Sequence, residues 1–401
     1  MPEQPDAIVK HIADVPGRST RAIVDLGVIA TNVEVIAREY AAEKKICAVV
    51  KGDGYGHGAV MVAKTALAAG ATLTAVATVG EAANLRRYGI SCPILILGPT
   101  DQSELPRAIG LGCELMIGSI QQLGAIRALS EYSATRPGVH LKIDTGMHRY
   151  GCAPDEAVSL ARAIDTSGLH FAGIATHFHS ADDADSSSAV AQMQLFQNLA
   201  EQIRSVISQT PDIHFSNSAG ILHHFVEGAA IIRLGMGMYG MSPGPDTPAP
   251  ASLNPALSVI SRLARVHCAH PGDIVSYGQT FREEADERLG LVPLGYADGY
   301  FRILSNRAWM GVDGYQCPIR GRICMDQTVV GAIPESASRQ SLVGVMGPLG
   351  GGPSLDELAD LAGTINYEIA ASISARVDRY YIRNGELVAR LSEGCVEEFD
   401  A

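Results

Sequence analysis

The chain has 401 residues, which is enough for one large domain and a smaller one. Hydrophobic residues make up 47% of it, aromatic residues make up 5%, and there are 42 glycines, a composition typical of a soluble α/β protein rather than a membrane-spanning or disordered one. The 31 basic and 43 acidic side chains give a formal net charge of −12 without a long basic run, so neither nucleic acid nor a membrane surface is an expected partner.

Cysteine usage and the amino-terminal sequence predict a cytoplasmic protein without a metal centre. The eight cysteines are scattered and include no Cys-x-x-Cys pair, which argues against a zinc site and a disulfide framework and favours a reducing compartment. No apolar run approaches the length of a transmembrane helix. Residues 1–18 are polar and lack the apolar centre of a signal peptide, and we expect them to form a poorly ordered arm.

After this arm, apolar runs alternate with helical patterns. A strand at 22–26 and an amphipathic helix at 29–42 come first. Eight further strands are predicted near 46–51, 74–79, 93–97, 114–117, 139–144, 171–178, 213–217 and 229–234. The clearest helices between them cover 59–69, 119–132, 154–167 and 188–208. Continuous apolar strands joined by helices predict a parallel sheet, here a (β/α)8 TIM-like barrel over 19–245. An open doubly wound sheet is the alternative, but no Gly-x-Gly-x-x-Gly follows an early strand.

The character of the chain changes at a proline-rich linker, 241–250. Beyond it, short β-like runs separated by turn signals predict a mainly β domain over 246–401. These runs lie at 257–268, 273–277, 289–293, 309–313, 316–324, 327–332 and 341–346. One helix is expected near 354–362, since Ser354 could cap it and Glu357 suits its first turn.

The strand at 46–51 ends in Lys51, and four glycines follow within seven residues. A lysine at the end of a buried strand loses hydration, so its pKa falls and the neutral amine becomes available. Such an amine can form a Schiff base with a carbonyl, which pyridoxal phosphate presents. The glycines allow the backbone to approach a bulky cofactor, and Tyr55 is near enough to hydrogen-bond to it. Taken alone, the lysine could equally point to solvent beside a flexible turn.

Polar side chains also follow the later barrel strands, and functional groups of such barrels lie at the carboxyl ends of the strands. They include Lys142, Arg149, His177, Asp182, His214, Asn217, Ser218 and Arg233. The Ser218 hydroxyl and the backbone N–H groups of Gly235 and Met236 could bind a phosphate. Arg233 cannot give up its proton, so beside the cofactor ring it would leave the pyridine nitrogen unprotonated. That weakens the electron sink and favours return of a proton over transamination.

Three segments of the second domain, 272–281, 290–300 and 321–327, complete a recognisable set. Together with Val-Val-Lys-x-x-x-Tyr-Gly-His-Gly at 49–58, they resemble, in form and order, the motifs of the alanine racemase family that uses pyridoxal phosphate. The similarity runs from about Arg18 to about Arg390. It implies a barrel followed by a β domain, a head-to-tail homodimer, and active sites completed by the partner's second domain.

The resemblance also implies residue roles. Lys51 would bind the cofactor and act as the base on one face of the substrate Cα, and Tyr277 of the other subunit would act on the opposite face. His177 would neighbour Tyr277, Arg149 would bind the cofactor and the substrate carboxylate, and Arg233 would face the pyridine with His214 behind it. Tyr55, Asn217, Ser218, Gly235 and Met236 would complete the cofactor site, and Met325, Asp326 and Tyr296 would contact substrate. Lys142 matches a lysine that is often carbamylated in the family, and Asp182, Arg302 and Arg322 match residues at the entrance.

One position departs from the family pattern. In the family, Ile-Asn-Tyr-Glu is usually followed by six residues and then a tyrosine, and Ala375 stands at that tyrosine position in this chain. The missing ring predicts room for a substrate larger than alanine, such as serine or an α-substituted amino acid. The alternative is that Tyr380 or Tyr381 fills the space.

Other functions remain possible at this point. A decarboxylase or aldolase on the same barrel is one, although decarboxylases usually place an acid where Arg233 stands. A pyridoxal-phosphate carrier without catalysis is another, although such relatives end at the barrel. The sequence leaves open the preferred amino acid, the state of Lys142, the catalytic rate and the pathway.

Overall fold

A computed structural model describes residues 4–130, 136–244, 246–247 and 249–399. The chain divides into two compact units. The barrel unit consists of Ala30–Gly54 and Val62–Leu253, and the β unit consists of Met1–Ile29, Tyr55–Met61 and Asn254–Ala401. Neither unit is continuous in sequence. Among the described residues, no helix combines the length and apolarity needed to cross a bilayer.

Eight parallel strands form the barrel unit, in the spatial order β8-β7-β6-β5-β4-β3-β2-β9. Each coincides with a predicted run: β2 (Lys45–Val49), β3 (Leu73–Val76), β4 (Ile94–Ile96), β5 (Cys113–Ile117), β6 (Gly138–Lys142), β7 (His170–Ala175), β8 (Asp212–His214) and β9 (Ile231–Leu234). Two backbone hydrogen bonds join the first and last strands, from Ala230 N to Ile213 O at 2.8 Å and from Arg233 N to Ser216 O at 3.1 Å. The sheet therefore closes on itself, as the (β/α)8 prediction requires.

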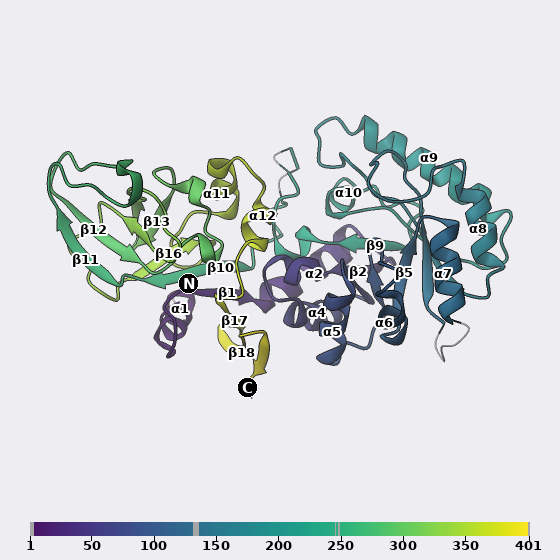
Figure 1. The fold of residues 1–401 in the computed structure, drawn as a ribbon, viewed down its shortest axis with the longest axis horizontal. Coiled ribbons are helices and arrows are strands. Elements are labelled where there is room, and N and C mark those ends of the chain that lie inside the picture. Colours follow the sequence, from purple (N-terminus) through teal and green to yellow (C-terminus); the bar gives the residue numbers. More distant parts are fainter. Residues whose placement is uncertain (1–3, 131–135, 245, 248, 400–401) are drawn as a thin grey trace. The chain divides into compact units, whose positions relative to one another are not determined.

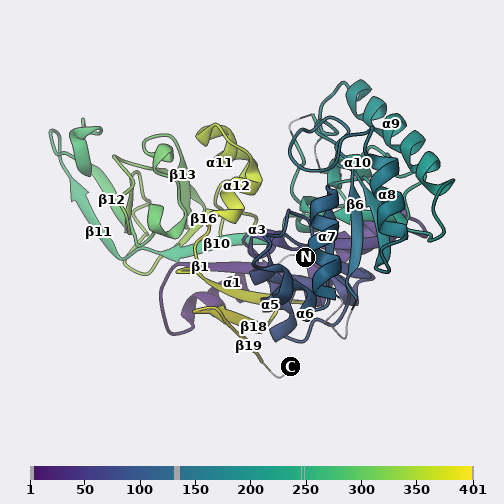
Figure 2. The same cartoon turned by 45° about the vertical axis from the view of Figure 1, so that its right-hand side comes forward.

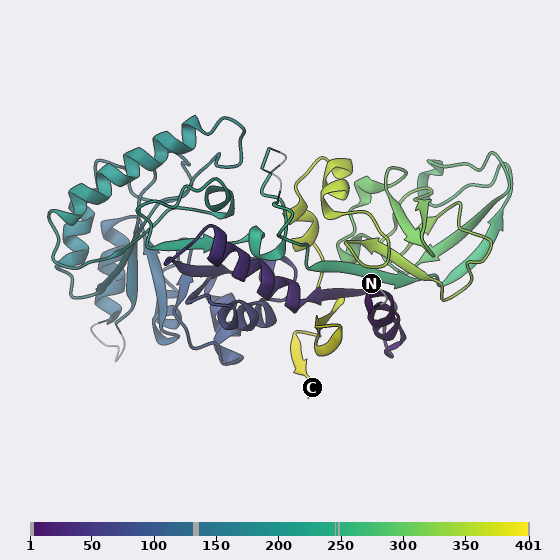
Figure 3. The same cartoon turned by 180° about the vertical axis from the view of Figure 1, so that it is seen from behind.

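Helices alternate with these strands, and Figures 1 and 2 show α5, α7 and α8 on the outside of the sheet. They are α2 (Leu26–Glu39), the short α3 (Lys51–Tyr55), α4 (Ala59–Ala68), α5 (Val79–Arg87), α6 (Leu105–Gly110), α7 (Ile120–Ser130), α8 (Ala157–Asp165), α9 (Ser187–Arg204) and α10 (Ser218–Leu222). The long teal helix α9 packs beside α8, as Figure 3 shows from behind. Because helices cover the sheet, its strands are buried almost throughout, which explains their continuous apolar sequences. The end of the helix predicted at 119–132 lies outside the described residues.

The β unit contains two sheets. The larger has eight strands in the order β14-β13-β16-β10-β1-β17-β18-β19, and the smaller has the order β11-β12-β15. The strands are β1 (Arg21–Asp25), β10 (Leu257–Arg262), β11 (Arg265–Ala269), β12 (Glu287–Val292), β13 (Trp309–Val312), β14 (Tyr315–Pro318), β15 (Thr328–Val330), β16 (Leu342–Met346), β17 (Asp378–Arg383), β18 (Glu386–Ser392) and β19 (Cys395–Glu398). The helix predicted at 354–362 is α11 (Leu355–Ala362), and the Ser354 and Glu357 side chains form its capping box. A second helix, α12 (Asn366–Ala371), follows it.

Some β predictions need correction. The single run predicted at 257–268 is two strands, β10 and β11, which lie in different sheets. The run at 273–277 forms only an isolated bridge, between Ile274 and Arg282. The strand after Arg18 pairs with β10 and β17 in the β unit rather than with any barrel strand.

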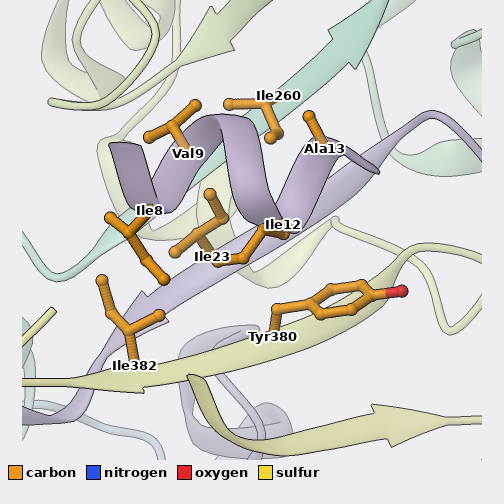
Figure 4. Packing of buried hydrophobic residues seen from close by; sticks show 8 residues of the cluster. All are labelled: Ile8, Val9, Ile12, Ala13, Ile23, Ile260, Tyr380 and Ile382. Atoms are coloured by element: carbon orange, nitrogen blue, oxygen red, sulfur yellow. The ribbon is translucent and has the colours of Figure 1, made fainter. Parts of the chain in front are cut away.

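The prediction of a poorly ordered arm at 1–18 is wrong, because residues Gln4–Asp14 form helix α1. Its apolar side chains Ile8, Val9, Ile12 and Ala13 pack on Ile23, Ile260, Tyr380 and Ile382 (Figure 4). The Arg21 guanidinium donates to the carbonyls of Ile12 and Val15 and so satisfies the end of the helix. The spacing of these apolar residues is helical, but the apolar face is short and alternates with polar residues, so it was not recognised in the sequence.

Candidate active site

Lys51 lies two positions after the last residue of β2, Val49, and begins the left-handed turn α3. Gly52, Asp53 and Gly54 have φ angles of 62°, 51° and 63°. Glycine adopts this conformation freely, whereas another residue loses roughly 1–2 kcal/mol. The turn is fixed where it begins, because Gly52 N–H donates to Glu81 Oε1 at 2.6 Å and Glu81 itself caps helix α5. The strand therefore stops abruptly and leaves Lys51 half-buried at its carboxyl end.

The surroundings of Lys51 favour its neutral amine. Burial lowers the pKa of Lys51, and the positive charges of Arg149 and Arg233 lower it further, against the opposing charge of Glu81. A neutral amine is the form that attacks a carbonyl. The lowered pKa has the direction that the sequence predicts for a lysine at the end of a buried strand.

Arg233 lies on β9 with its guanidinium inside the barrel, 4% exposed. It donates to the carbonyls of Thr176 at 2.9 Å and Phe215 at 3.0 Å. It also donates to His214 Nδ1 at 3.1 Å and His177 Nδ1 at 3.0 Å. Burial lowers the pKa of Arg233 to about 10, so the side chain stays positively charged at neutral pH and acts only as a donor.

These bonds define the protonation of both histidines. Since Arg233 has no acceptor atom, the Nδ1 atoms of His177 and His214 must accept, and each ring carries its proton on Nε2. Burial, with nearby positive charge, holds the pKa of His177 and of His214 well below its ordinary value. Both rings are therefore neutral near pH 7, and the Nε2–H of His177 is available to donate.

Lys142 and Arg149 flank a loop after β6. Two backbone hydrogen bonds close the loop, from Asp144 N to Cys152 O and from Cys152 N to Lys142 O, both 2.9 Å. The Asp144 carboxylate accepts from the backbone N–H groups of Gly146 and His148, both at 3.0 Å. Burial, followed by the charge of Arg233, lowers the pKa of Lys142 to about 7. Half of this amine is thus neutral near pH 7, while Arg149 is exposed on the loop.

Ser218 is buried where α10 begins, between the ends of β8 and β9. Its Oγ accepts from Gly235 N–H at 3.0 Å and from Gly237 N–H at 3.3 Å, so its own proton is left to donate elsewhere. Asn217 caps α10, because its side chain accepts from Gly220 N at 2.9 Å. Met236 begins the short 3₁₀ turn that follows β9. The Gly235 N–H was predicted from the sequence to bind a phosphate, but in the structure it donates to Ser218 Oγ.

The carboxyl end of the barrel is strongly cationic. Lys51, Lys142, Arg149 and Arg233 are close enough for their charges to affect the same pKa values. The acids that oppose them are Glu81 and Asp144. The basic groups of this cluster fit an anionic ligand such as a phosphate or an amino-acid carboxylate. Asp182 lies apart from this cluster, against the segment that contains Gly244 and Thr247.

Tyr55 follows the left-handed turn and belongs to the β unit. It has a φ of 53°, and burial raises the pKa of its phenol to about 12. The segment after it packs tightly, since a Cβ on Gly58 would lie 1.8 Å from Tyr381 Oη. Tyr55 is thus a neutral hydrogen-bonding group at neutral pH.

Tyr277 is 70% exposed, and Arg322 lies beside the turn that carries it. Ser276, just before it, has φ 64° and ψ −170°, a conformation that is costly for a residue with a side chain. A 2.5 Å hydrogen bond from Ser276 Oγ to Arg322 O holds this backbone. Gly278 lies against the Arg322 guanidinium, where an added Cβ would be 2.8 Å from Cζ.

Tyr296, Met325 and Arg302 lie on segments joined by hydrogen bonds. Tyr296 N donates to Cys324 O at 3.0 Å. Ser305 Oγ donates to Arg302 O at 2.5 Å and accepts from Ile323 N at 3.0 Å. Met325 is 53% exposed. Asp326, predicted to contact substrate, forms an ion pair with Arg376 at 2.7 Å.

Ala375 is exposed and lines a cavity of about 570 Å³ with Arg18, Arg376, Asp378, Arg390, Ser392 and Glu393. Tyr380 and Tyr381 are completely buried. Tyr380 packs under α1, and Tyr381 packs on Gly58. Both rings therefore pack inside the β unit.

Sequence reasoning missed several polar residues of the barrel unit. Gln192 ties the strand-end loops together, because it donates to Thr145 Oγ1 at 3.2 Å and accepts from His179 N at 3.0 Å. His140 and Glu114 extend the chain of bonds behind His214. His140 could have been found, since it stands two residues before Lys142 on the same strand and faces the same side.

A closed barrel with a half-buried lysine and a cationic cluster at its carboxyl end, followed by a mainly β unit, defines a two-unit enzyme of the TIM-barrel class. Comparison with family models identifies the protein family more closely. The model described as alanine racemase, N-terminal domain matches residues 24–243, and alanine racemase, C-terminal domain matches residues 256–381. The chain belongs to the alanine racemase family.

Individual relatives agree. The alanine racemase of Desulfovibrio desulfuricans is 36% identical over 370 residues, which cover 91% of this chain and 98% of the relative. That of Lactiplantibacillus plantarum is 40% identical over 375 residues, with the same coverage of both chains. The crystal structure of alanine racemase from Bacillus anthracis with bound L-Ala-P has a TM-score of 0.89 and 34% identity, covering 94% of this chain and 98% of that one.

Proposed function

We propose that this protein interconverts L- and D-alanine with pyridoxal phosphate as its cofactor. Membership of the alanine racemase family supports the activity. The observation that carries the proposal is Lys51, a half-buried lysine with a lowered pKa at the end of a barrel strand, beside the charges of Arg149 and Arg233. A decarboxylase or an aldolase fits these residues less well, since Arg233 occupies the position where decarboxylases usually place an acid. A carrier protein fits less well because such relatives end at the barrel.

The residues present fit pyridoxal phosphate. Lys51 would hold the cofactor covalently, Arg233 would donate to its pyridine nitrogen, and Ser218 and Tyr55 would donate to its phosphate. Asn217, Gly235 and Met236 would shape the phosphate end. When bound, the cofactor supplies the electron sink that acidifies the substrate Cα–H. Because Arg233 remains protonated, it restrains that sink and favours simple return of a proton.

Two bases are needed, one on each face of the substrate Cα. Lys51 is the base on one face. Tyr277 of a second copy of the chain is the base on the other, in a head-to-tail homodimer that shares its active sites. Its exposure in the single chain suits this role. The His177 Nε2–H, left free by the bond from Arg233 to Nδ1, can donate to the Tyr277 oxygen and stabilise it as an anion.

The substrate carboxylate would be bound by Arg149 and by the backbone N–H of Met325 from the second copy. Lys142, whose pKa is about 7, has enough neutral amine to react with carbon dioxide, and the resulting carbamate would be an anion that orients Arg149. Tyr296, Asp182, Arg302 and Arg322 would line the entrance. Asp326 would act through its ion pair with Arg376. We place the protein in the cytoplasm on the cysteine pattern of its sequence.

A second candidate is racemisation of an amino acid larger than alanine, such as serine, because Ala375 lacks the tyrosine ring of the family pattern. Tyr380 does not replace the missing ring, because it is buried under α1.

Exchange of the substrate α-hydrogen tests the function. The protein, supplied with pyridoxal phosphate, is incubated in D2O with single enantiomers of alanine, serine, valine and α-methylserine, and products are separated by chiral chromatography. Inversion of alanine with deuterium at Cα is the expected result, whereas α-methylserine has no α-hydrogen and should not react. Release of CO2 or an aldehyde without inversion would contradict the proposal.

A further inference from the structure

A chain of hydrogen bonds crosses the inside of the barrel and ends on Arg233. Its links are Arg233 Nη1 to His214 Nδ1 at 3.1 Å, His214 Nε2 to His140 Nδ1 at 2.9 Å, and His140 Nε2 to Glu114 Oε2 at 2.9 Å. The two imidazole rings meet edge to face, with centroids 5.0 Å apart. His214 and His140 are 0% and 1% exposed, so no solvent intervenes.

The chain has one possible direction. Arg233 can only donate, so His214 must accept at Nδ1 and carry its proton on Nε2. That N–H donates to His140 Nδ1, which leaves the His140 proton on Nε2, where it meets the carboxylate of Glu114. An ionised carboxylate can only accept. With Arg233 as the donor at one end and Glu114 as the acceptor at the other, both rings must carry their proton on Nε2.

Two glycines make room for this chain. His140 lies on β6 and His214 on β8, and between them Gly173 of β7 pairs with His140. A Cβ on Gly173 would lie 2.2 Å from His140 Nδ1 and 3.0 Å from His214 Nε2. Only a glycine on the middle strand lets the rings meet across it. Gly138 on β6 similarly leaves space for Glu114, since its Cβ would be 3.1 Å from Glu114 Cγ.

We propose that Glu114 and His140 are positioning residues that fix the tautomer of His214 and thereby hold the Arg233 guanidinium in its charged, donating orientation. The proposal deepens the proposed racemase function and rests on it, because it assigns a purpose to the residues behind Arg233. The carboxylate of Glu114 balances the charge that Arg233 brings into the barrel. Burial raises the pKa of Glu114, but the hydrogen bond from His140 opposes that effect, and the net shift is downward, which keeps the carboxylate ionised.

The first test measures the tautomers directly. In protein labelled with ¹⁵N-histidine, the imidazole shifts distinguish Nδ1–H from Nε2–H, with or without cofactor. We expect both His140 and His214 to carry Nε2–H. A His214 ring protonated on Nδ1 would overturn the proposal whether or not the protein racemises alanine.

The second test removes the acceptor for His214. In His140→Leu the buried His214 Nε2–H loses its partner, so the ring shifts toward the Nδ1–H form, which opposes the Arg233 donor. We expect kcat for alanine to fall about 10- to 100-fold, the usual range for outer-shell partners, while KM changes less than about twofold. His140→Gln, whose amide oxygen can accept the same proton, should retain the His214 tautomer and most of kcat.

A milder variant covers the case in which His140→Leu does not fold. Glu114→Gln keeps the shape and removes the charge, and we expect kcat to fall about three- to tenfold, with a shift of the His140 Nε2 signal. Asp212→Asn is the matched control, because Asp212 lies on β8 of the same barrel but pairs with Lys45. Unchanged kcat and unchanged imidazole signals in Glu114→Gln would show that the chain is only structural. Failure of the wild-type protein to racemise alanine, although its histidines carry the expected tautomers, would overturn the proposed function instead.

Discussion

The two units place their functional groups in opposite environments. In the barrel unit, Arg233 and His214 are 4% and 0% exposed. Their polar atoms are paired with one another, with strand carbonyls and with Glu114 through His140. In the β unit, Tyr277 and Met325 are 70% and 53% exposed. The barrel unit thus contributes buried, mutually hydrogen-bonded groups to the proposed site, whereas Tyr277 and Met325 of the β unit lie at its surface.

This difference suggests how the site is built. A buried network of charged hydrogen bonds can be kept in one geometry only if each member has a partner, and the barrel provides those partners itself. An exposed tyrosine has no such constraint, although the strained backbone at Ser276 fixes where Tyr277 leaves the chain. We infer that a second copy of the chain covers Tyr277. The following predictions test the two halves separately.

The largest effect is expected from Tyr277→Phe, which removes the proposed base of the exposed half. Loss of one acid–base group typically costs about 10²- to 10⁴-fold in rate, so kcat for alanine should fall by about that factor. The reaction is followed in both directions by chiral chromatography. Tyr315→Phe is the control, since Tyr315 is also an exposed tyrosine of the β unit, at 61%. Equal activity of the two variants would remove Tyr277 from the mechanism.

Next in size is the pH dependence of stability due to Lys142 in the buried half. Its pKa is about 7 when folded and 10.5 ordinarily, so between these values the unfolded chain binds more protons than the folded one and stability rises with pH. Below about pH 7 the folded protein must carry a buried charge. Lys142→Met should therefore stabilise the cofactor-free protein by a few kcal/mol at pH 6, about 1.4 kcal/mol being expected for each unit of pKa shift.

The gain from Lys142→Met should shrink toward pH 10. Urea unfolding at pH 6, 8 and 9.5, in buffers free of carbon dioxide, measures it. A gain that is independent of pH would mean that Lys142 is not buried as a titrating amine.

An effect of similar or smaller size is expected at α1, far in sequence from every proposed site residue. Ile12 is 0% exposed under the helix, and truncation of a buried isoleucine costs about 2–5 kcal/mol. Ile12→Ala should lower the free energy of unfolding by that amount in urea titrations. Lys10→Ala on the exposed face of α1 is the control. Equal stability of the two would indicate that α1 does not pack on the sheet in solution.

The smallest effect is expected from Ala375→Tyr. Refilling the cavity should reduce activity on serine relative to alanine by a factor of several, because a pocket discriminates a small change in side-chain size by roughly 1–3 kcal/mol. The ratio of kcat/KM for the two amino acids is the measurement. Ala371→Tyr is a control at another exposed alanine of the β unit. An unchanged ratio would show that Ala375 does not set specificity.

The sequence predicts the barrel well, because its strands are buried on both faces and read as continuous apolar runs, from Ile46–Val50 to Ile231–Leu234. It also predicts the residues at the strand ends, since position in such a barrel decides which side chains meet. The β unit is harder. Strands β17, β18 and β19 carry many charged side chains and were not predicted, because their pairing is decided by partners distant in sequence.

The connection of Glu114 and His140 to Arg233 could not be recognised from sequence either, although the position of His140 two residues before Lys142 places it on the same face of its strand. Glu114 and His140 stand inside strands rather than at their ends, and their contact with His214 depends on the absence of a side chain at Gly173 on an intervening strand. Such a juxtaposition becomes visible only when the register of the strands is known. Helix α1 was missed for a simpler reason, since its apolar stripe is short and separated by polar residues.

Subunit complementation tests most directly the central claim, that each site combines a barrel half and a β half from different copies. Lys51→Ala and Tyr277→Phe variants, each strongly impaired alone, are unfolded together and refolded as a mixture. If the halves come from different copies, each mixed dimer has one site with neither substitution, and racemisation of alanine should reappear on mixing. If activity stays at the level of the separate variants although mixed dimers form, as native mass spectrometry would establish, both bases lie in one chain and the claim is wrong.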